Sequence, residues 1–297
     1  MIYVDISGGI GNQLFQYAFA RDVSLKLNEK LVLDDTWYQQ STDRFFRLDY
    51  FNINARVGLK KYEKLYHAFH NNTFVPRQLR KILPQLIYNK SYYISQKKFC
   101  FYPVEIKGFN RRIGLGGLWQ SEKYFEKSTS IIRNDLQFND DMFPEIVLDK
   151  GVLIQNENSI MLHVRRGDYL SVPIYENLEK KYFIDAIELV CSKINAPKFY
   201  IFSDDINWVQ FNLLNYFEKQ NINYCIIGFT KTDIEDFFLM SKCRHAIISN
   251  STFSWWAAWL NENNQKLIIA PDRWFKREVT KYPDIDILPG RWIKIHV

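Results

Sequence analysis

The sequence predicts an α/β protein built from two domains, each with a parallel sheet covered by helices. Short β-branched runs alternate with longer segments of helical period in both halves of the chain. The strand-like runs are almost continuously apolar, which is typical of strands buried on both faces of a parallel sheet. With 297 residues, of which 47% are hydrophobic, the chain is long enough to form two such cores.

The first half opens with a strand at residues 2–6, a glycine turn, a helix over 12–27 and a second strand at 31–33. Residues 45–102 show no clean period, and we interpret them as irregular helices. In the second half, helices alternate with predicted strands at 159–164, 198–203, 224–228, 245–249 and 266–270. A polar stretch before the strand at 159 gives domains 1–154 and 155–297.

Composition and charge narrow the class of protein without deciding it. The chain carries 39 basic and 33 acidic residues and has a pI near 8.9, which suits an anionic ligand, a nucleic acid or an anionic membrane surface. Its four cysteines show neither a metal-ligand nor a disulfide pattern. The N-terminus lacks the features of a signal peptide, and no run of about 18 apolar residues occurs. We therefore expect a cytoplasmic protein, with peripheral contact at the inner face of the membrane left open.

Glycine and polar residues gather where the predicted strands end, which is where parallel sheets bind ligands, and two such halves predict a cleft. The first strand leads into SGGIGNQLFQ, in which Gly9 and Gly11 allow close backbone approach to a ligand and the next helix offers N–H groups to an anion. The run does not complete a dinucleotide fingerprint. A tight turn with Asn12 capping the helix explains it equally well.

The strand at 159–164 runs into RRGDY, which places His163, Arg165, Arg166 and Asp168 around its end. Guanidinium groups bind phosphate oxygens in pairs and stay charged, so one or two arginines could neutralise a departing diphosphate without a metal ion. From these residues alone, an ion pair between Arg166 and Asp168 with His163 in the core is an equally good interpretation.

Two further strand ends carry hydrogen-bonding side chains. The strand at 198–203 ends in Ser203, Asp204 and Asp205, whose carboxylates can bind a base edge or ribose, or cap the next helix, which the spacing favours. After the strand at 245–249, hydroxyl and amide groups at a helix N-terminus can cradle a phosphate. These residues are Ser249, Asn250, Ser251 and Thr252. The tryptophans of that helix are expected in the core.

Together, GGIGNQLFQYAFA, HVRRGDY, FSDD and SNSTFSWWAAWL resemble the motifs of family 11 glycosyltransferases, the α-1,2-fucosyltransferases, and occur in the family's order. The resemblance implies a GT-B fold, in which two Rossmann-like domains face a central cleft. The acceptor is then expected mainly on residues 1–154 and the donor on 155–297, and the final segment can pack back on the first domain. The implied reaction moves L-fucose from GDP-β-L-fucose to the 2-hydroxyl of a galactoside, with inversion.

The resemblance also implies roles at matching positions. Arg165 is expected to bind the β-phosphate and stabilise the leaving group, with support from Arg166, while Asn12 positions donor and acceptor. Asp168 is the expected base, with Glu176 as second choice. The other expected donor-binding residues contact the nucleotide, its ribose or the diphosphate. They are Gly9, Gly11, His163, Ser203, Asp204, Asp205, Ser249, Asn250, Ser251, Thr252 and Phe253.

No cofactor or metal ion is expected. The triplet at 284–286 has the letters of a metal-binding DxD pair but lies outside the four motifs. The expected partners are GDP-fucose and a galactose-terminated oligosaccharide or lipid-linked glycan. A dinucleotide-dependent oxidoreductase fits less well because the glycine fingerprint is incomplete, and a nucleic-acid-binding protein because no basic stripe concentrates the charge.

Overall fold

The computed structural model describes residues 1–60, 63, 91–98, 100–106, 112–276 and 286–297. The chain forms two compact units, residues 1–137 and 138–297. The division comes before α6 (Glu145–Gln155), whereas the sequence placed it after residue 154. Helix α6 belongs to the second unit because it packs on α10 (Asp233–Lys242), so closely that a Cβ on Gly151 would lie 2.8 Å from the Phe238 ring.

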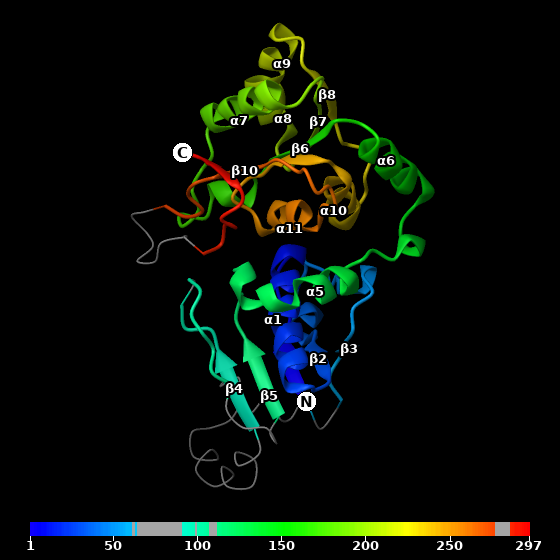
Figure 1. Ribbon diagram of the computed structural model, residues 1–297, viewed down its shortest axis with the longest axis vertical. Helices are drawn as coiled ribbons and strands as arrows, with labels where there is room; N and C mark the ends of the chain where they lie inside the picture. The colour runs from blue at the N-terminus through cyan, green and yellow to red at the C-terminus, as the bar shows by residue number, and fades with distance from the viewer. Residues whose placement is uncertain (61–62, 64–90, 99, 107–111, 277–285) are drawn as a thin grey trace. The chain divides into compact units, whose positions relative to one another are not determined.

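The first unit contains a parallel sheet of strand order β3-β2-β1-β5-β4 (Figure 1). Helix α1 starts after a turn in which Gly8 has a φ of +76°, and it ends at Asn28, which adopts the left-handed conformation of a helix C-cap. The elements are β1 (Ile2–Asp5), α1 (Ile10–Leu27), β2 (Leu31–Asp34), η1 (Thr36–Gln39), η2 (Leu48–Tyr50), β3 (Arg56–Val57), β4 (Ser91–Ser95), β5 (Arg112–Gly116), η4 (Glu122–Tyr124), η5 (Glu126–Ser128) and α5 (Thr129–Asp135).

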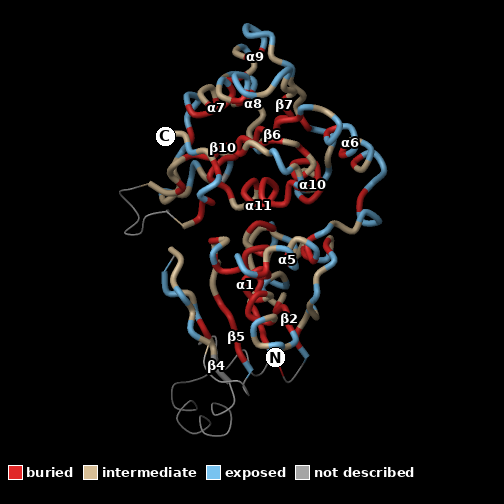
Figure 2. The backbone as a smooth tube through the Cα atoms, viewed as in Figure 1, coloured by how far each residue is buried: buried red, intermediate tan, exposed pale blue. Residues whose placement is uncertain are grey.

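The second unit contains a parallel sheet of strand order β11-β10-β9-β6-β7-β8. Its centre is buried on both faces, as the red tube of β6 and α11 shows in Figure 2. Besides α6 and α10, its elements are η6 (Asp140–Met142), β6 (Ser159–Val164), η7 (Asp168–Leu170), α7 (Lys180–Lys193), β7 (Lys198–Ser203), α8 (Ile206–Val209), η8 (Gln210–Leu214), α9 (Asn215–Lys219), β8 (Asn223–Ile226), β9 (His245–Ile247), α11 (Thr252–Leu260), β10 (Ile268–Pro271) and β11 (Ile293–Ile295).

The predicted alternation of strands and helices is confirmed, and the tryptophans of α11 lie in the core as expected. The interpretation of residues 45–102 as irregular helices agrees with η2 but is wrong for residues 56–57 and 91–95, where β3 and β4 join the sheet. Strand β5 has no counterpart in the prediction because glycine disfavours strands. Here Gly114 is needed, since a Cβ on it would lie 2.5 Å from the ring of Tyr93 on the neighbouring strand. The end of the chain, β11, forms an edge of the second sheet.

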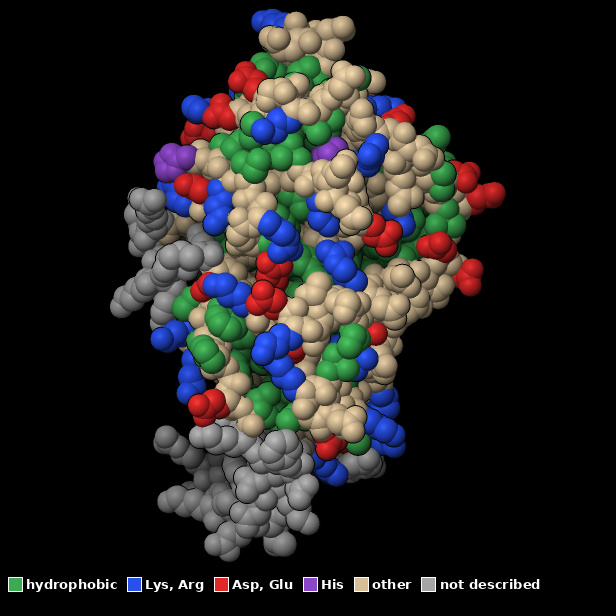
Figure 3. Space-filling view, viewed as in Figure 1, with side chains coloured by type: hydrophobic (Ala, Val, Ile, Leu, Met, Phe, Trp, Pro, Cys, Tyr) green, Lys and Arg blue, Asp and Glu red, His purple; other side chains and the backbone are tan. Residues whose placement is uncertain are grey.

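Charges are mixed on the face of the molecule that Figure 3 shows. In the face shown in Figure 3, basic and acidic side chains are interspersed, without the single-sign stripe that nucleic-acid binding favours. Among the helices that the structure describes, none is both long and apolar enough to cross a membrane.

Candidate functional site

Three motif segments of the second unit converge at the carboxyl ends of adjacent strands. Strand β6 lies between β9 and β7, with Val164 paired to Ser203 and Leu162 paired to Ile247. The residues that follow these strands therefore meet at one edge of the sheet. This is the edge where open parallel sheets bind ligands.

Asp204 holds the first arginine of the HVRRGDY motif. Arg165 Nη1 lies 2.9 Å from Asp204 Oδ2, and the backbone N–H of Arg166 donates to Asp204 Oδ1 at 2.8 Å. The two side chains of the ion pair are only 23% and 25% exposed, so their attraction is less screened than that of a surface pair. The guanidinium is thereby fixed at the sheet edge while it stays accessible to solvent.

The second arginine is held by a neighbouring carboxylate and a ring. Arg166 Nε lies 3.4 Å from Asp205 Oδ2, and its guanidinium stacks 4.4 Å from the centre of the Trp208 ring. Asp205 also accepts a hydrogen bond from the Trp208 N–H at 2.9 Å, which confirms the helix-cap interpretation for this residue. Both arginines thus find their acidic partners on the β7 segment.

Ser249 and Asn250 make their hydrogen bonds inside the unit. The hydroxyl of Ser249 donates to the His163 carbonyl at 2.7 Å and accepts from the Arg165 N–H at 3.0 Å. Asn250 Nδ2 donates to the carbonyls of Glu176 and Trp274, each at 2.8 Å. Both residues are buried. Their side chains hold the strand ends and two loops together, and neither side chain faces solvent.

Helix α11 presents its N-terminus at the same edge. Ser251 is the N-cap, with a hydroxyl that accepts the N–H of Phe253 at 3.3 Å. Thr252 and Phe253 are the motif residues at this end that remain partly exposed. The positive end of the helix dipole therefore adds to the two guanidinium groups in favouring a bound anion.

His163 is neutral and nearly enclosed. Burial, together with the nearby Arg165 charge, lowers its pKa from 6.5 to about 3. The imidazole lies 5.7 Å from the Phe253 ring, and within the described structure its Nδ1 is buried without a hydrogen-bond partner. A neutral ring cannot supply positive charge to a bound anion, and the buried Nδ1 is not accessible from solvent.

An aromatic stack that the sequence patterns did not predict lies beside Arg165. The rings of Tyr169 and Tyr175 stack 4.0 Å apart, Phe275 lies 5.7 Å beyond Tyr175, and the Arg165 guanidinium lies 5.5 Å from the Tyr169 ring. A backbone bridge between Tyr175 and Phe275 fastens this loop to the residues after β10. The signal was available in the sequence, because PDRWF follows a predicted strand as the other motifs do.

The two candidate bases lie on this loop. Asp168 begins η7, but its side chain lies outside what the structure describes. Glu176 is partly buried, with Oε2 3.5 Å from Nη1 of Arg273.

In the first unit, the glycine turn starts α1. Gly9 is the N-cap and Gly11 lies buried in the first turn of the helix. Asn12 is also inside the helix, so the interpretation of Asn12 as the cap is wrong. Its Oδ1 instead accepts a hydrogen bond from Gln120 Nε2 at 2.9 Å, which ties the turn to the loop after β5.

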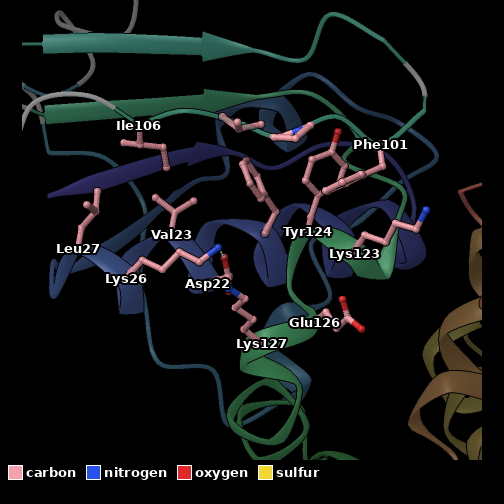
Figure 4. Close-up of a pocket in the computed structure, with 13 residues that line it drawn as sticks. Asp22, Val23, Lys26, Leu27, Phe101, Ile106, Lys123, Tyr124, Glu126 and Lys127 are labelled. Carbon is pink, nitrogen blue, oxygen red and sulfur yellow. Dashed lines mark ion pairs between the residues drawn. The ribbon is translucent and has the colours of Figure 1, made fainter.

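A separate cavity of about 510 Å³ opens along the second half of α1 (Figure 4). Lys26, Lys123 and Lys127 surround it, and Asp22 at its wall already pairs with Lys26 at 2.5 Å. None of the site residues predicted from the sequence lines this cavity.

Within the described residues, no three His, Cys, Asp or Glu side chains are grouped as a metal ion would need. The triplet at 284–286 lies outside the described residues except for Asp286.

Comparison with known proteins places these features in a family. An Escherichia coli protein named alpha-1,2-colitosyltransferase is 32% identical, over 99% of this chain and 99% of that protein. A Caenorhabditis elegans galactoside 2-alpha-L-fucosyltransferase is 29% identical over 61% of this chain and 52% of its own length. Among solved structures, POFUT1 in complex with GDP-fucose matches 90% of this chain and 97% of that one, with a TM-score of 0.51 and 13% identity.

The structural likeness and the two parallel α/β units confirm the GT-B fold. The family model described as Glycosyl transferase family 11 matches residues 1–296. On this match and the similarity along the full chain, the protein belongs to glycosyltransferase family 11.

Proposed function

We propose that the enzyme transfers L-fucose from GDP-β-L-fucose to the 2-hydroxyl of a galactoside, with inversion and without a metal ion. The observation that carries this proposal is the pair Arg165 and Arg166, each held by a carboxylate of the β7 segment beside the N-terminus of α11. That arrangement suits a diphosphate, whose negative charge needs fixed positive partners. The names of the relatives supply the sugar and the linkage.

The arginines act on the leaving group. As the bond between the sugar anomeric carbon and the diphosphate oxygen breaks, negative charge grows on the β-phosphate. A guanidinium already oriented by Asp204 stabilises that charge without the cost of reorganising at the moment of reaction. Arg166, stacked on Trp208, adds a second positive charge beside it. The helix dipole of α11 adds partial charge of the same sign.

The acceptor 2-hydroxyl attacks the opposite face of the sugar and must lose its proton. We propose that Asp168, which lies on the loop next to Arg165, accepts this proton as the general base, with Glu176 as the second choice. The neutral ring of His163 and the partly exposed Phe253 are assigned to the nucleotide. Ser249 and Asn250 act through the loops that they hold.

Colitosyl transfer is the second candidate, because a relative that matches 99% of this chain carries that name. Colitose differs from L-fucose by the absence of the 3-hydroxyl group. The two activities therefore share the diphosphate site and differ in the contacts to one hydroxyl. GDP-colitose and GDP-fucose must be compared directly.

The test is a screen of GDP-sugars against β-galactoside acceptors, with the product linkage determined by NMR. We expect fucose transfer to O2 in wild type, and a fall in kcat of about 10²- to 10³-fold in Arg165→Ala. Arg291→Ala, an exposed arginine of the same unit, serves as the control. If only GDP-colitose, and not GDP-fucose, serves as donor, the enzyme is a colitosyltransferase. Wild-type turnover in Arg165→Ala would refute the arginine mechanism.

A further inference from the structure

Exposed aromatic side chains lie next to the glycine turn of the first unit. Trp37, in η1, is 44% exposed and Phe45 is 59% exposed, whereas the other tryptophans of the described chain are buried or half-buried. Trp37 meets the Tyr38 ring edge-on at 5.0 Å. The Tyr38 ring in turn lies 5.9 Å from that of Phe46, so these side chains form a group, and grouped aromatic side chains at the surface mark binding sites where single ones do not.

Hydrogen bonds fasten this aromatic segment to the turn. The Tyr38 hydroxyl donates to the Gly8 carbonyl at 2.9 Å. The buried Gln13 donates through Nε2 to the carbonyls of Gly8 and Phe45, at 3.1 and 2.8 Å, and accepts the Arg47 N–H at 2.8 Å. The backbone that carries the exposed rings is therefore held in place against the glycine turn.

The surface lies at the carboxyl edge of the first sheet. The glycine turn follows β1, the Trp37 segment follows β2, and Gln120 follows β5, and these three strands are adjacent. Ligands of parallel sheets bind at this edge. The loops after these strands thus meet where a ligand is expected.

The chemistry of the surface matches a sugar ring. A pyranose has an apolar C–H face, which packs on an aromatic ring, and a rim of hydroxyls, which needs donors and acceptors. The amides of Asn12 and Gln120, which hydrogen bond to each other at 2.9 Å, provide such groups at the turn. The guanidinium of Arg44, whose Nε lies 3.6 Å from Asp43 Oδ2, is next to Phe45 in the sequence and provides further donors. Arg44 Nη1 lies 3.9 Å from the position that a Cβ on Gly9 would take, so its charge covers the turn.

We propose that Trp37, Phe45 and Arg44 form a carbohydrate subsite that binds the acceptor glycan at the glycine turn. This inference rests on the proposed transferase function, because it makes the bound sugar an acceptor. It predicts that acceptor affinity can be reduced without loss of donor binding, since the diphosphate site lies in the second unit.

The experiment compares initial rates of Trp37→Ala and Phe45→Ala with wild type, varying acceptor and GDP-fucose separately. We expect the acceptor KM to rise about tenfold in each variant, equivalent to about 1.4 kcal/mol. The KM for GDP-fucose should stay unchanged. Trp37→Tyr should restore most of the acceptor affinity, and Phe211→Ala, an exposed aromatic of the second unit, should behave as wild type. An unchanged acceptor KM in both alanine variants, or a rise in donor KM instead, overturns the proposal.

A second measurement separates this inference from the transferase assignment. Wild type and Trp37→Ala are applied to a glycan array without donor, and circular dichroism confirms that both are folded. Glycan binding that disappears in Trp37→Ala supports the subsite even if no GDP-sugar is transferred. Absence of glycan binding by wild type overturns it, as does a dimer that dissociates in Trp37→Ala, because the rings would then serve self-association.

Discussion

Replacing Gly167 with alanine should disturb the proposed diphosphate site through its contact with the Asp204 side chain. A Cβ at this position would lie 2.5 Å from Asp204 Oδ2 and 3.2 Å from Asp204 Cγ, closer than ordinary contact, which begins at 3.4 Å. The φ of Gly167 lies outside the left-handed region, so alanine fits the backbone. The Asp204 carboxylate must therefore move, by roughly 1 Å.

That movement cannot be absorbed freely, because both carboxylate oxygens are engaged. Oδ2 lies 2.9 Å from Arg165 Nη1, and Oδ1 accepts the Arg166 N–H at 2.8 Å. A hydrogen bond between charged groups contributes about 1.5–3 kcal/mol, and solvent screening of these partly exposed side chains reduces that to about 1–2 kcal/mol. If Asp204 orients Arg165 for the transition state, kcat/KM should fall about tenfold.

The assay is steady-state transfer with varied donor, together with urea unfolding. Gly228→Ala is the matched control, because a Cβ there meets nothing within 4 Å. The free energy of unfolding of Gly228→Ala should match that of wild type within about 0.5 kcal/mol. That of Gly167→Ala should fall by no more than about 1–2 kcal/mol, the contribution of the disturbed contacts, so both variants stay folded in the assay. If Gly167→Ala shows the same kcat/KM as Gly228→Ala, Asp204 does not position Arg165 and the reasoning fails.

Three other outcomes follow from buried polar groups and the arginine site. Burial raises the pKa of Asp236 from 3.8 to about 6, so the stability that its protonated form contributes is present near pH 4 and lost as pH rises through 6. The unfolding free energy of Asp236→Asn should therefore be about 2–3 kcal/mol higher than that of wild type at pH 8, and equal to it near pH 4. A difference that does not change with pH in urea titrations would contradict this. Asn250→Ala leaves the buried Trp274 carbonyl and the partly buried Glu176 carbonyl without their donor, and should lower the unfolding free energy by about 2–4 kcal/mol in the same assay. A loss below about 0.5 kcal/mol would mean that water replaces the amide. Treatment with EDTA should leave turnover unchanged, and activity that disappears and returns with manganese would show that a cation, not the arginine pair, neutralises the diphosphate.

The parallel sheets were predictable because their strands are apolar runs separated by helices of clear period. Strand β5 was not, because its glycines are explained by Tyr93 on a neighbouring strand, a contact that no local pattern reveals. Contacts between segments distant in the sequence also limited the prediction of the site. The motifs showed which strand ends carry charge, but not that the partners of the two arginines come from the β7 segment instead of their own loop.

The structure also changes how motif residues are interpreted. Roles transferred from a family assume that a motif residue touches the ligand, yet the Ser249 hydroxyl already donates to the His163 carbonyl and accepts the Arg165 N–H. A serine whose hydroxyl both donates and accepts inside the protein fixes the backbone at Arg165, so any effect on a bound donor would be indirect. Thr252 and Phe253, which are partly exposed, are better placed for direct contact. Substitutions at these two positions should therefore change donor affinity at nearly constant stability, whereas substitutions at Ser249 should change both together.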